Sequence, residues 1–315
     1  MVKWFNNKFD REIEREKLIK YTKRNLRKNS FDEFFRKLSI TNWLIIFNII
    51  VFILVLIFSY IFSENKINSL FALQANNFFS GYVWTPLTSM FMHANIIHLF
   101  VNMFSLFFLG NFVERIIGRK RFFAFYIISG LFAGLFFVFL SFFLGGDGIN
   151  CNITFFGGCL ESKIFVARTV SAVGASGAIF AIAGLLALLT PRNKVYLIAG
   201  PLIAIIIQAI FVGIFNKNPF LNILDIFINL YIIFSIFALF SFNPRIRRLS
   251  LPIQMPFWIL PLVAIVPLFI IGLFVDLPIG NTAHLGGIIS GLFYALYLKN
   301  KYRMKTELIS RIFSR

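Results

Sequence analysis

The sequence predicts an all-α, polytopic helical membrane protein, and three observations support this fold class. Hydrophobic residues fill 58% of the 315 positions, 44 of them phenylalanine, whereas charged residues fill only 14%. This is not the composition of a water-soluble globular domain. The apolar residues also gather in stretches of about 20, the length that a helix needs to cross a bilayer, and the basic residues gather between these stretches.

Eight apolar stretches are long enough, or nearly so, to be membrane spans. Lipid excludes unpaired backbone groups, so each stretch is expected to be a helix. In chain order they are residues 43–62, 94–113, 122–144, 171–190, 195–215, 221–241, 257–275 and 282–298.

The distribution of positive charge predicts how these spans are oriented. The net charge is +18, and much of it lies before residue 43, in the loops "ERIIGRKR", "PRNK" and "NPRIRR", and in the final tail. Cytoplasmic loops carry the excess of Lys and Arg in membrane proteins. We therefore expect a multi-pass protein of the cell membrane with both termini in the cytoplasm, whose basic residues face the lipid bilayer rather than a nucleic acid.

Three regions follow from this pattern. Residues 1–42 form a basic cytoplasmic segment without the pattern of a cleavable signal, so the first span is expected to stay in the mature protein. This segment is read either as helices lying on the inner leaflet or as a solvated arm. Residues 43–298 form the membrane domain, and residues 299–315 form a basic cytoplasmic tail.

Polar residues inside the second span are the first candidates for function. In "FMHANIIHLFVNMF", His98 and Asn102 are four positions apart and share a helix face, with His93 just before them. Polar side chains are costly within a membrane and often mark functional sites. A pair of side chains that hydrogen-bonds a neighbouring helix is the alternative interpretation.

Two further stretches bring in a serine and the third histidine. Ser176 lies within Gly174–Gly177, at the start of the fourth predicted span, and His284 lies at the start of the last one. Both spans are expected to begin at the outer membrane face. Gly287 and Gly291 follow His284 on its own face, where small residues allow two helices to approach closely. If the two helices are neighbours, His284 can act as general base for Ser176, and His98 and Asn102 can stabilise the oxyanion.

These motifs resemble those of the rhomboid intramembrane serine proteases. The resemblance rests on His93-x4-His98-x3-Asn102, on Gly174-Ala175-Ser176-Gly177, on Ala283-His284-x2-Gly287-x3-Gly291, and on "LGNFVERIIGRKRF" with Gly110, Glu114 and Gly118. It implies a six-helix core and a Ser176–His284 dyad without a carboxylate. The dyad would cleave single-span membrane protein substrates near the outer face. It also implies that Phe180 stacks on the imidazole, and that no metal or cofactor is required.

The sequence departs from the family pattern in three places. Trp84 is followed by Thr85 where the family often has arginine. Three predicted spans separate Ser176 from His284 where the minimal core has one, which indicates an inserted transmembrane hairpin within residues 195–241. The outer loop after residue 144 is longer than the core needs. It contains Cys151 and Cys159, read either as a disulfide or as free thiols, and a glycosylation sequon at Asn152.

Other classes of protein are less consistent with these residues. A zinc protease would need an H-E-x-x-H motif, and an aspartyl protease would need paired aspartates in two spans; the sequence has neither. A polytopic transporter would be expected to show internal repeats. A catalytically inactive relative that binds membrane proteins is the remaining alternative, although both dyad residues are present. The sequence does not indicate an oligomeric state.

Overall fold

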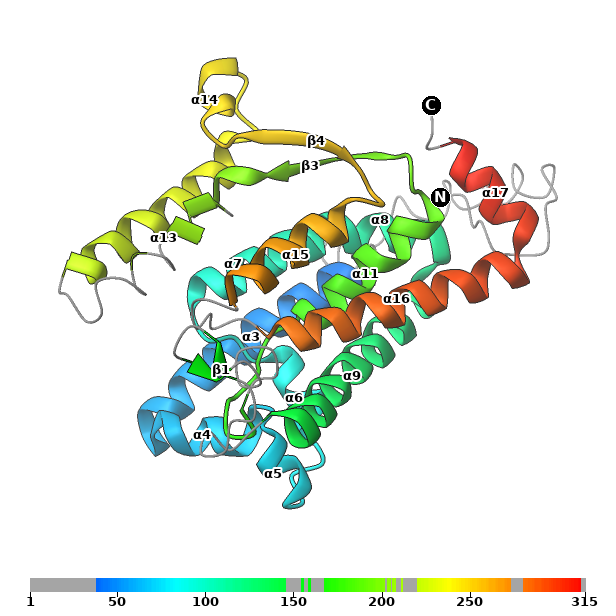
Figure 1. Cartoon of the computed structure of the whole chain (residues 1–315). Coiled ribbons are helices and arrows are strands. Elements are labelled where there is room, and N and C mark those ends of the chain that lie inside the picture. The colour runs from blue at the N-terminus through cyan, green and yellow to red at the C-terminus, as the bar shows by residue number, and fades with distance from the viewer. Residues whose placement is uncertain are drawn as a thin grey trace, which may run out of the picture.

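The computed structural model describes residues 38–145, 154–155, 158–159, 167–201, 203–204, 206–207, 211, 220–272 and 280–312, and shows a bundle of helices (Figure 1). The first half of the bundle contains α3 (Ile40–Phe62), α4 (Glu64–Phe71), α5 (Ala75–Phe79), α6 (Thr85–Thr88), the 3₁₀-helix η1 (Ser89–Phe91), α7 (Ile96–Ser105), the π-helical η2 (Leu106–Gly110), α8 (Asn111–Ile117) and α9 (Arg119–Leu144).

The second half contains more short elements. It consists of β1 (Thr154–Phe155), β2 (Gly158–Cys159), α11 (Ser176–Leu189), β3 (Lys194–Ile198), α13 (Phe220–Ala238), α14 (Pro244–Arg248), β4 (Pro252–Pro256), α15 (Leu260–Gly272), α16 (Asn281–Lys301) and α17 (Arg303–Ile312). Strands β1 and β2 pair with each other, and so do β3 and β4, both antiparallel.

The helical membrane character predicted from the sequence is confirmed. Among the described residues, three helical segments are long and apolar enough to cross a membrane: Ile40–Phe62, Ile96–Ile117 and Arg119–Leu144. Shorter apolar helices are found at Ser176–Leu189 and Ile223–Ala238. Large apolar side chains such as Leu56 and Phe143 are exposed on the outside of the bundle, as expected where lipid replaces water as the solvent.

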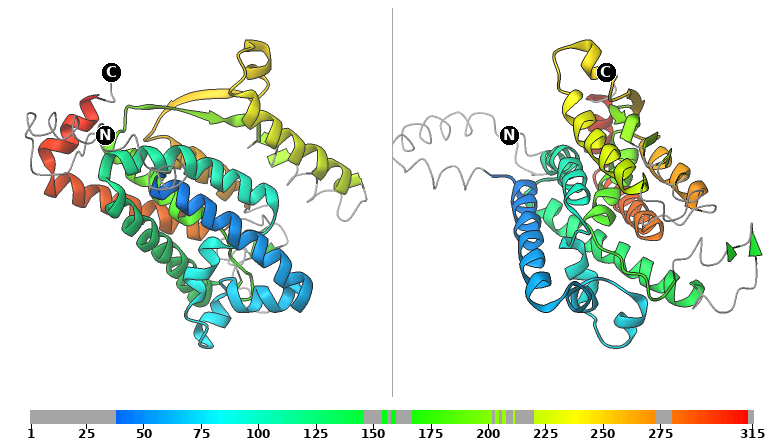
Figure 2. Two further views of the ribbon diagram at one scale, coloured as in Figure 1. Left: turned by 180° about the vertical axis from the view of Figure 1, so that it is seen from behind. Right: turned by 90° about the vertical axis from the view of Figure 1, so that its left-hand side faces the viewer.

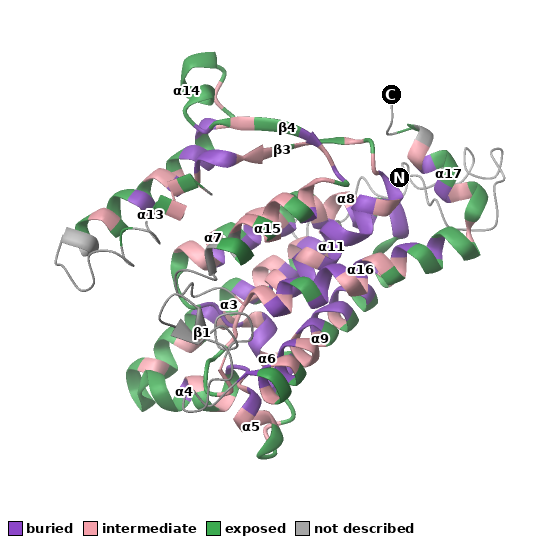
Figure 3. Cartoon of the chain, viewed as in Figure 1, coloured by how far each residue is buried: buried purple, intermediate pink, exposed green. Residues whose placement is uncertain are grey.

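Helix α11 lies in the middle of the bundle (Figure 1). It packs on α16 and α9 on one side and on α15 and α7 on another. Most of its residues are buried, as Figure 3 shows by colour. The view from behind in Figure 2 shows α3 alongside α7 and α8, with which it is in contact. The serine-bearing helix is therefore the one most enclosed by protein.

The predicted helix at 195–215 is wrong at its start. Residues 194–198 form strand β3, which pairs with β4 so that Lys194 lies opposite Pro256 and Ile198 opposite Pro252. The described residues from 199 onward, up to 211, are helical. A short apolar run such as "VYLI" fits a strand or a buried helix equally well by pattern, and its β-branched and aromatic residues favour a strand.

Two other predicted spans begin later than expected. The stretch from 171 becomes helical only at Ser176, because Ala172 forms an isolated antiparallel bridge with Leu73. The stretch from 257 becomes helical at Leu260, after strand β4 and a turn. Both differences arise from pairing with residues far away in the sequence.

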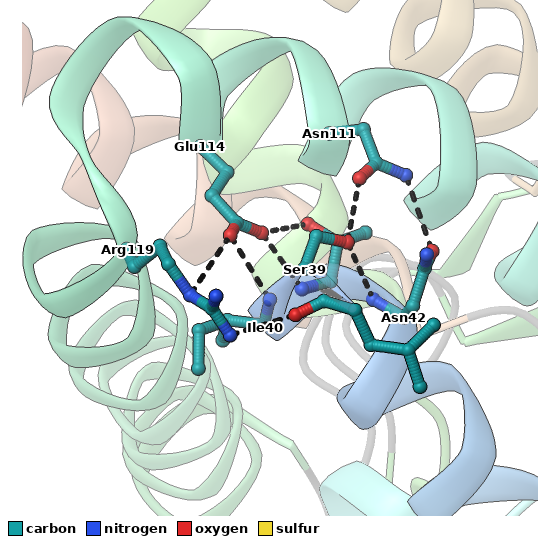
Figure 4. Close-up of polar contacts among 8 residues, drawn as sticks. Ser39, Ile40, Asn42, Asn111, Glu114 and Arg119 are labelled. Atoms are coloured by element: carbon teal, nitrogen blue, oxygen red, sulfur yellow. Dashed lines mark hydrogen bonds and ion pairs between the residues drawn. The ribbon is translucent and has the colours of Figure 1, made fainter. Parts of the chain in front are cut away.

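A buried carboxylate joins the first two long segments of the bundle (Figure 4). Glu114 on α8 accepts hydrogen bonds from the backbone N–H groups of Ile40 and Thr41, at 2.9 and 2.8 Å, and from the Thr41 hydroxyl at 2.8 Å. The Arg119 guanidinium lies 3.7 Å from the same carboxylate. The first N–H groups of a helix have no partner within the helix and favour an anion. Glu114 thus caps α3 and holds α8 against it.

Candidate active site

Ser176 is the first residue of α11 and follows a sharp change in backbone direction. Gly174 has φ = 124°, in the left-handed region that favours glycine. Its N–H donates to the carbonyl of Ser89 at 2.8 Å. Together with the bridge between Leu73 and Ala172, this bond holds the segment that leads into the helix. The serine is therefore presented by a fixed turn at a helix N-terminus.

His284 reaches α11 because α16 packs very closely on that helix. A Cβ atom at Gly287 would overlap the carbonyl oxygen of Gly177, and one at Gly291 would overlap that of Ala181. Only glycine allows the two backbones to come so close. The predicted packing of the Gly287–Gly291 face is thereby observed, and its partner is the serine helix.

The structure brings the serine and the histidine into hydrogen-bond contact. The Nε2 atom of His284 lies 2.8 Å from the Oγ atom of Ser176. The ring of Phe180 stacks on the imidazole, with 4.2 Å between centroids and 18° between planes. Within the described part of the chain, the buried Nδ1 atom of His284 has no hydrogen-bond partner. Among the described residues, the imidazole is thus oriented by an aromatic ring and not by a carboxylate.

His98 and Asn102 face the turn that precedes the serine. A Cβ atom at Gly174 would lie 2.9 Å from His98 Cε1 and 3.5 Å from Asn102 Nδ2. Asn102 is buried, and its Nδ2 has no hydrogen-bond partner among the described residues. A buried amide donor without a partner is costly in a structural role. The arrangement offers donors for a negatively charged oxygen beside Ser176, and this role stays a prediction.

His93 lies beside His98 rather than against the serine in the contacts that the structure gives. The two rings are 5.3 Å apart between centroids, inclined at 65°. Burial, and then the neighbouring His98, lower the pKa of His93 to about 4. Its imidazole is therefore neutral at pH 7, as suits a ring that packs against another histidine.

Two supporting residues were missed in the sequence analysis. Asn95 is the N-cap of α7, and its side-chain oxygen accepts a hydrogen bond of 2.8 Å from the backbone N–H of His98. An asparagine just before an apolar helix is a recognisable start signal. The Ser89 carbonyl, which accepts from Gly174, is specified only by the tertiary structure and leaves no pattern in the sequence.

The first loop is held without the arginine that often follows Trp84 in the family. The Trp84 indole donates to the carbonyl of Leu70 at 2.8 Å, and the Thr85 hydroxyl donates to that of Tyr82 at 2.7 Å. Cys151 and Asn152 lie outside the described residues, as does the side chain of Cys159, so the disulfide and the sequon stay untested. Among the described residues, no three His, Cys, Asp or Glu side chains are grouped as metal ligands would be.

Comparison with known proteins identifies the family of this chain. A family model for the rhomboid domain matches residues 80–223 and 231–301, which is more than half of the chain. The chain belongs to the rhomboid family. The matched residues include α7, α11 and α16, and thus every candidate residue of the site.

Three rhomboid relatives from Arabidopsis thaliana are similar over shorter stretches. RHOMBOID-like protein 2 is 36% identical over 97 residues, or 31% of this chain and 22% of that protein. RHOMBOID-like protein 6, mitochondrial, is 33% identical over 101 residues, covering 32% and 24%. Inactive RHOMBOID-like protein 8 is 36% identical over 75 residues, covering 24% and 21%. The aligned stretches span less than a quarter of each relative, and one of these rhomboids is named inactive.

Proposed function

We propose that this rhomboid is an intramembrane serine endopeptidase that cleaves single-span membrane proteins. The observation that carries the proposal is the 2.8 Å contact between His284 Nε2 and Ser176 Oγ. Serine needs a neighbouring base to become a nucleophile at neutral pH. The stacked Phe180 supports this assignment, because it keeps the imidazole in the plane from which Nε2 faces the hydroxyl.

The proposed reaction uses the Ser176–His284 contact and the two polar side chains of α7. His284 Nε2 takes the proton of Ser176 as Oγ bonds to the scissile carbonyl carbon. His98 and Asn102 donate hydrogen bonds to the oxyanion of the tetrahedral intermediate. The C–N bond then breaks, and His284 returns the proton to the leaving amine. Water, with His284 again as base, hydrolyses the acyl-enzyme and frees Ser176.

The same reasoning assigns an orientation in the cell membrane. Ser176 and His284 lie in the first turns of α11 and α16, and α16 ends with Lys299 and Lys301. Basic residues favour the cytoplasmic side. The active site would then lie toward the outer face, where water can reach the acyl-enzyme, and the segment before α3 and the tail with α17 would be cytoplasmic.

Labelling with a serine-reactive fluorophosphonate tests this function directly. The full chain, purified in detergent, is expected to be labelled at Ser176, and Ser176→Ala and His284→Ala are expected to abolish labelling at unchanged expression. Ser290→Ala, a substitution on α16 whose hydroxyl donates to the Gly287 carbonyl, is the control that keeps the label. Absence of labelling in the unmodified protein, beside an active rhomboid that labels, would establish an inactive relative instead.

A further inference from the structure

Strands β3 and β4 lie at the two ends of residues 194–256 and pair with each other. Strand β3 follows the end of α11, and strand β4 leads into α15; their pairing puts Lys194 opposite Pro256. We call residues 194–256 the ribbon-tethered segment. Its described part includes α13 and α14 (Figure 1). Because both ends of the segment meet in the two-stranded ribbon, α13 can change position without separating α11 from α15.

Helix α13 packs on the bundle through one narrow apolar face. Ile228, Ile232 and Ile236, spaced four residues apart, are buried. They form a cluster with Ile97, Phe100 and Phe104 of α7. The rings of Phe100 and Phe237 add a stacked contact, with 5.9 Å between centroids. The described contacts between the two helices are thus made by apolar side chains, which would separate without breaking a described hydrogen bond.

The helix that α13 covers is the one that carries His98 and Asn102. These two residues point toward Gly174, whereas the α13 contacts lie on a different face of α7, as the helical spacing of Ile97, Phe100 and Phe104 requires. The π-helical turn η2 separates this part of α7 from α8, and α8 is fixed to α3 through Glu114. A π-helical turn within a helix often marks a functional site.

Two sides of the serine helix are closed to a large substrate. On the α16 side, Gly287 and Gly291 bring the backbones together. On the α9 side, a Cβ atom at Gly177 would lie 2.8 Å from that of Ala133. Helix α3 lies against α7, and its Phe47 is in edge contact with Phe91 of η1, just before α7, at 4.9 Å between centroids. Among the described elements packed around the serine helix, these contacts leave the side between α7 and α15 as the approach for a transmembrane substrate.

Helix α13 lies on that side of the molecule. Figure 1 and the right-hand view of Figure 2 both place it on the side of α7 and α15, away from α9. At the other end of the serine helix, Phe112 of α8 stacks on Phe257 just before α15, with 6.1 Å between centroids. The α7–α15 boundary is thus closed at the end near α8, and α13 is packed along α7 from Ile97 to Phe104.

We propose that α13 is an intramolecular competitor of the substrate: it occupies the apolar face of α7 on which the transmembrane helix of a substrate docks. The partner is an apolar membrane-spanning helix, because α13 itself, an apolar helix with bulky aliphatic side chains, shows what this face accepts. The inference rests on the proposed protease function. As a consequence, cleavage of a membrane-embedded substrate requires α13 to leave α7. The reaction of Ser176 with a small fluorophosphonate does not require this movement.

A matched pair of substitutions on α13 tests the competition. Ile232 is 5% exposed and Ile226 is 58% exposed, so Ile232→Ala weakens the contact with α7, and Ile226→Ala removes the same atoms elsewhere. The full chain is reconstituted in liposomes with a single-span substrate. We expect Ile232→Ala to raise the cleavage rate severalfold and Ile226→Ala to leave it unchanged, while fluorophosphonate labelling is equal in all three proteins. Unchanged or slower cleavage by Ile232→Ala, with normal labelling, would overturn the proposal.

Cross-linking provides the reverse test. Phe100→Cys and Phe237→Cys are introduced together in a chain that also carries Cys151→Ser and Cys159→Ser, and a bismaleimide joins the new thiols. We expect cross-linking to abolish cleavage of the membrane-embedded substrate and to preserve labelling of Ser176; cleavage that continues after cross-linking would refute the competition. Absence of both labelling and cleavage in the unmodified chain would instead refute the protease function, and this inference with it.

Discussion

The imidazole of His284 lies flat against the ring of Phe180, one helical turn beyond the serine to which it is hydrogen-bonded. The stack joins α16 to α11 at the point where the two reacting groups meet. Among the described residues, His284 Nδ1 has no hydrogen-bond partner. The stack is therefore the main described contact that orients the ring.

Truncation of this ring is expected to slow the serine chemistry without unfolding the protein. An aromatic pair contributes about 0.5–1.5 kcal/mol beyond its buried area, so Phe180→Leu should lower the rate of fluorophosphonate labelling by up to about tenfold. Phe180→Tyr keeps the stacking surface and is expected to label at nearly the normal rate. Equal rates for Phe180→Leu and the unmodified chain would show that the ring does not position His284.

Gly174 is expected to tolerate no side chain, for two separable reasons. Its φ of 124° strains any L-residue, and a Cβ atom would press on His98 at 2.9 Å. Gly81 has a similar φ of 108° but open space around its Cα atom, so Gly81→Ala reports the strain alone.

The two alanine variants are compared by thermal unfolding in detergent and by the rate at which they cleave a single-span substrate in liposomes. We expect both to lose stability, by about 1 kcal/mol or more, and only Gly174→Ala to lose substrate cleavage as well. A Gly174→Ala protein that cleaves normally would show that the positions of His98 and Asn102 are not critical.

The contact between α11 and α16 predicts a severe effect at Gly287. A methyl group there overlaps the Gly177 carbonyl, which forces the helices apart and separates His284 from Ser176. Gly287→Ala should therefore abolish labelling and lower the unfolding temperature. Gly280→Ala, at the N-cap of the same helix, places its Cβ 3.7 Å from that of Ala283, an ordinary contact. It is expected to behave as the unmodified protein does.

Glu114 is expected to contribute to stability rather than to chemistry. Its carboxylate accepts three hydrogen bonds from Ile40 and Thr41, and a hydrogen bond to a charged group contributes about 1.5–3 kcal/mol. Glu114→Ala should thus lower the free energy of unfolding by several kcal/mol. Glu307→Gln breaks only an exposed ion pair with Arg303, for which the loss is about 0–1 kcal/mol.

The comparison for Glu114 is made at a temperature where both variants are folded. There, labelling of Ser176 should proceed at the normal rate in each of them. Loss of labelling in folded Glu114→Ala would show instead that the anchor between α8 and α3 also sets the geometry of the site.

Much of the fold was predictable because membrane helices are specified locally. The expected spans at 43–62 and 122–144 correspond to α3 and α9 within a few residues, since about 20 apolar residues in lipid have few alternatives to a helix. The run at 195–198 was misread because four apolar residues fit a strand or a helix, and the choice depended on β4, more than 50 positions away.

The sequence by itself determined the class of protein, the spacing of His98 and Asn102 on one helix face, and the presence of a serine and a histidine at the starts of two apolar helices. These features depend on composition and on helical period, which are local properties. Only the tertiary structure decided that Ser176 and His284 touch, that Phe180 covers the imidazole, and that α13 lies on α7. Contacts between helices depend on which surfaces fit together in three dimensions, as the glycines of α16 fit the backbone of α11, and that fit is a property of pairs of helices rather than of either sequence alone.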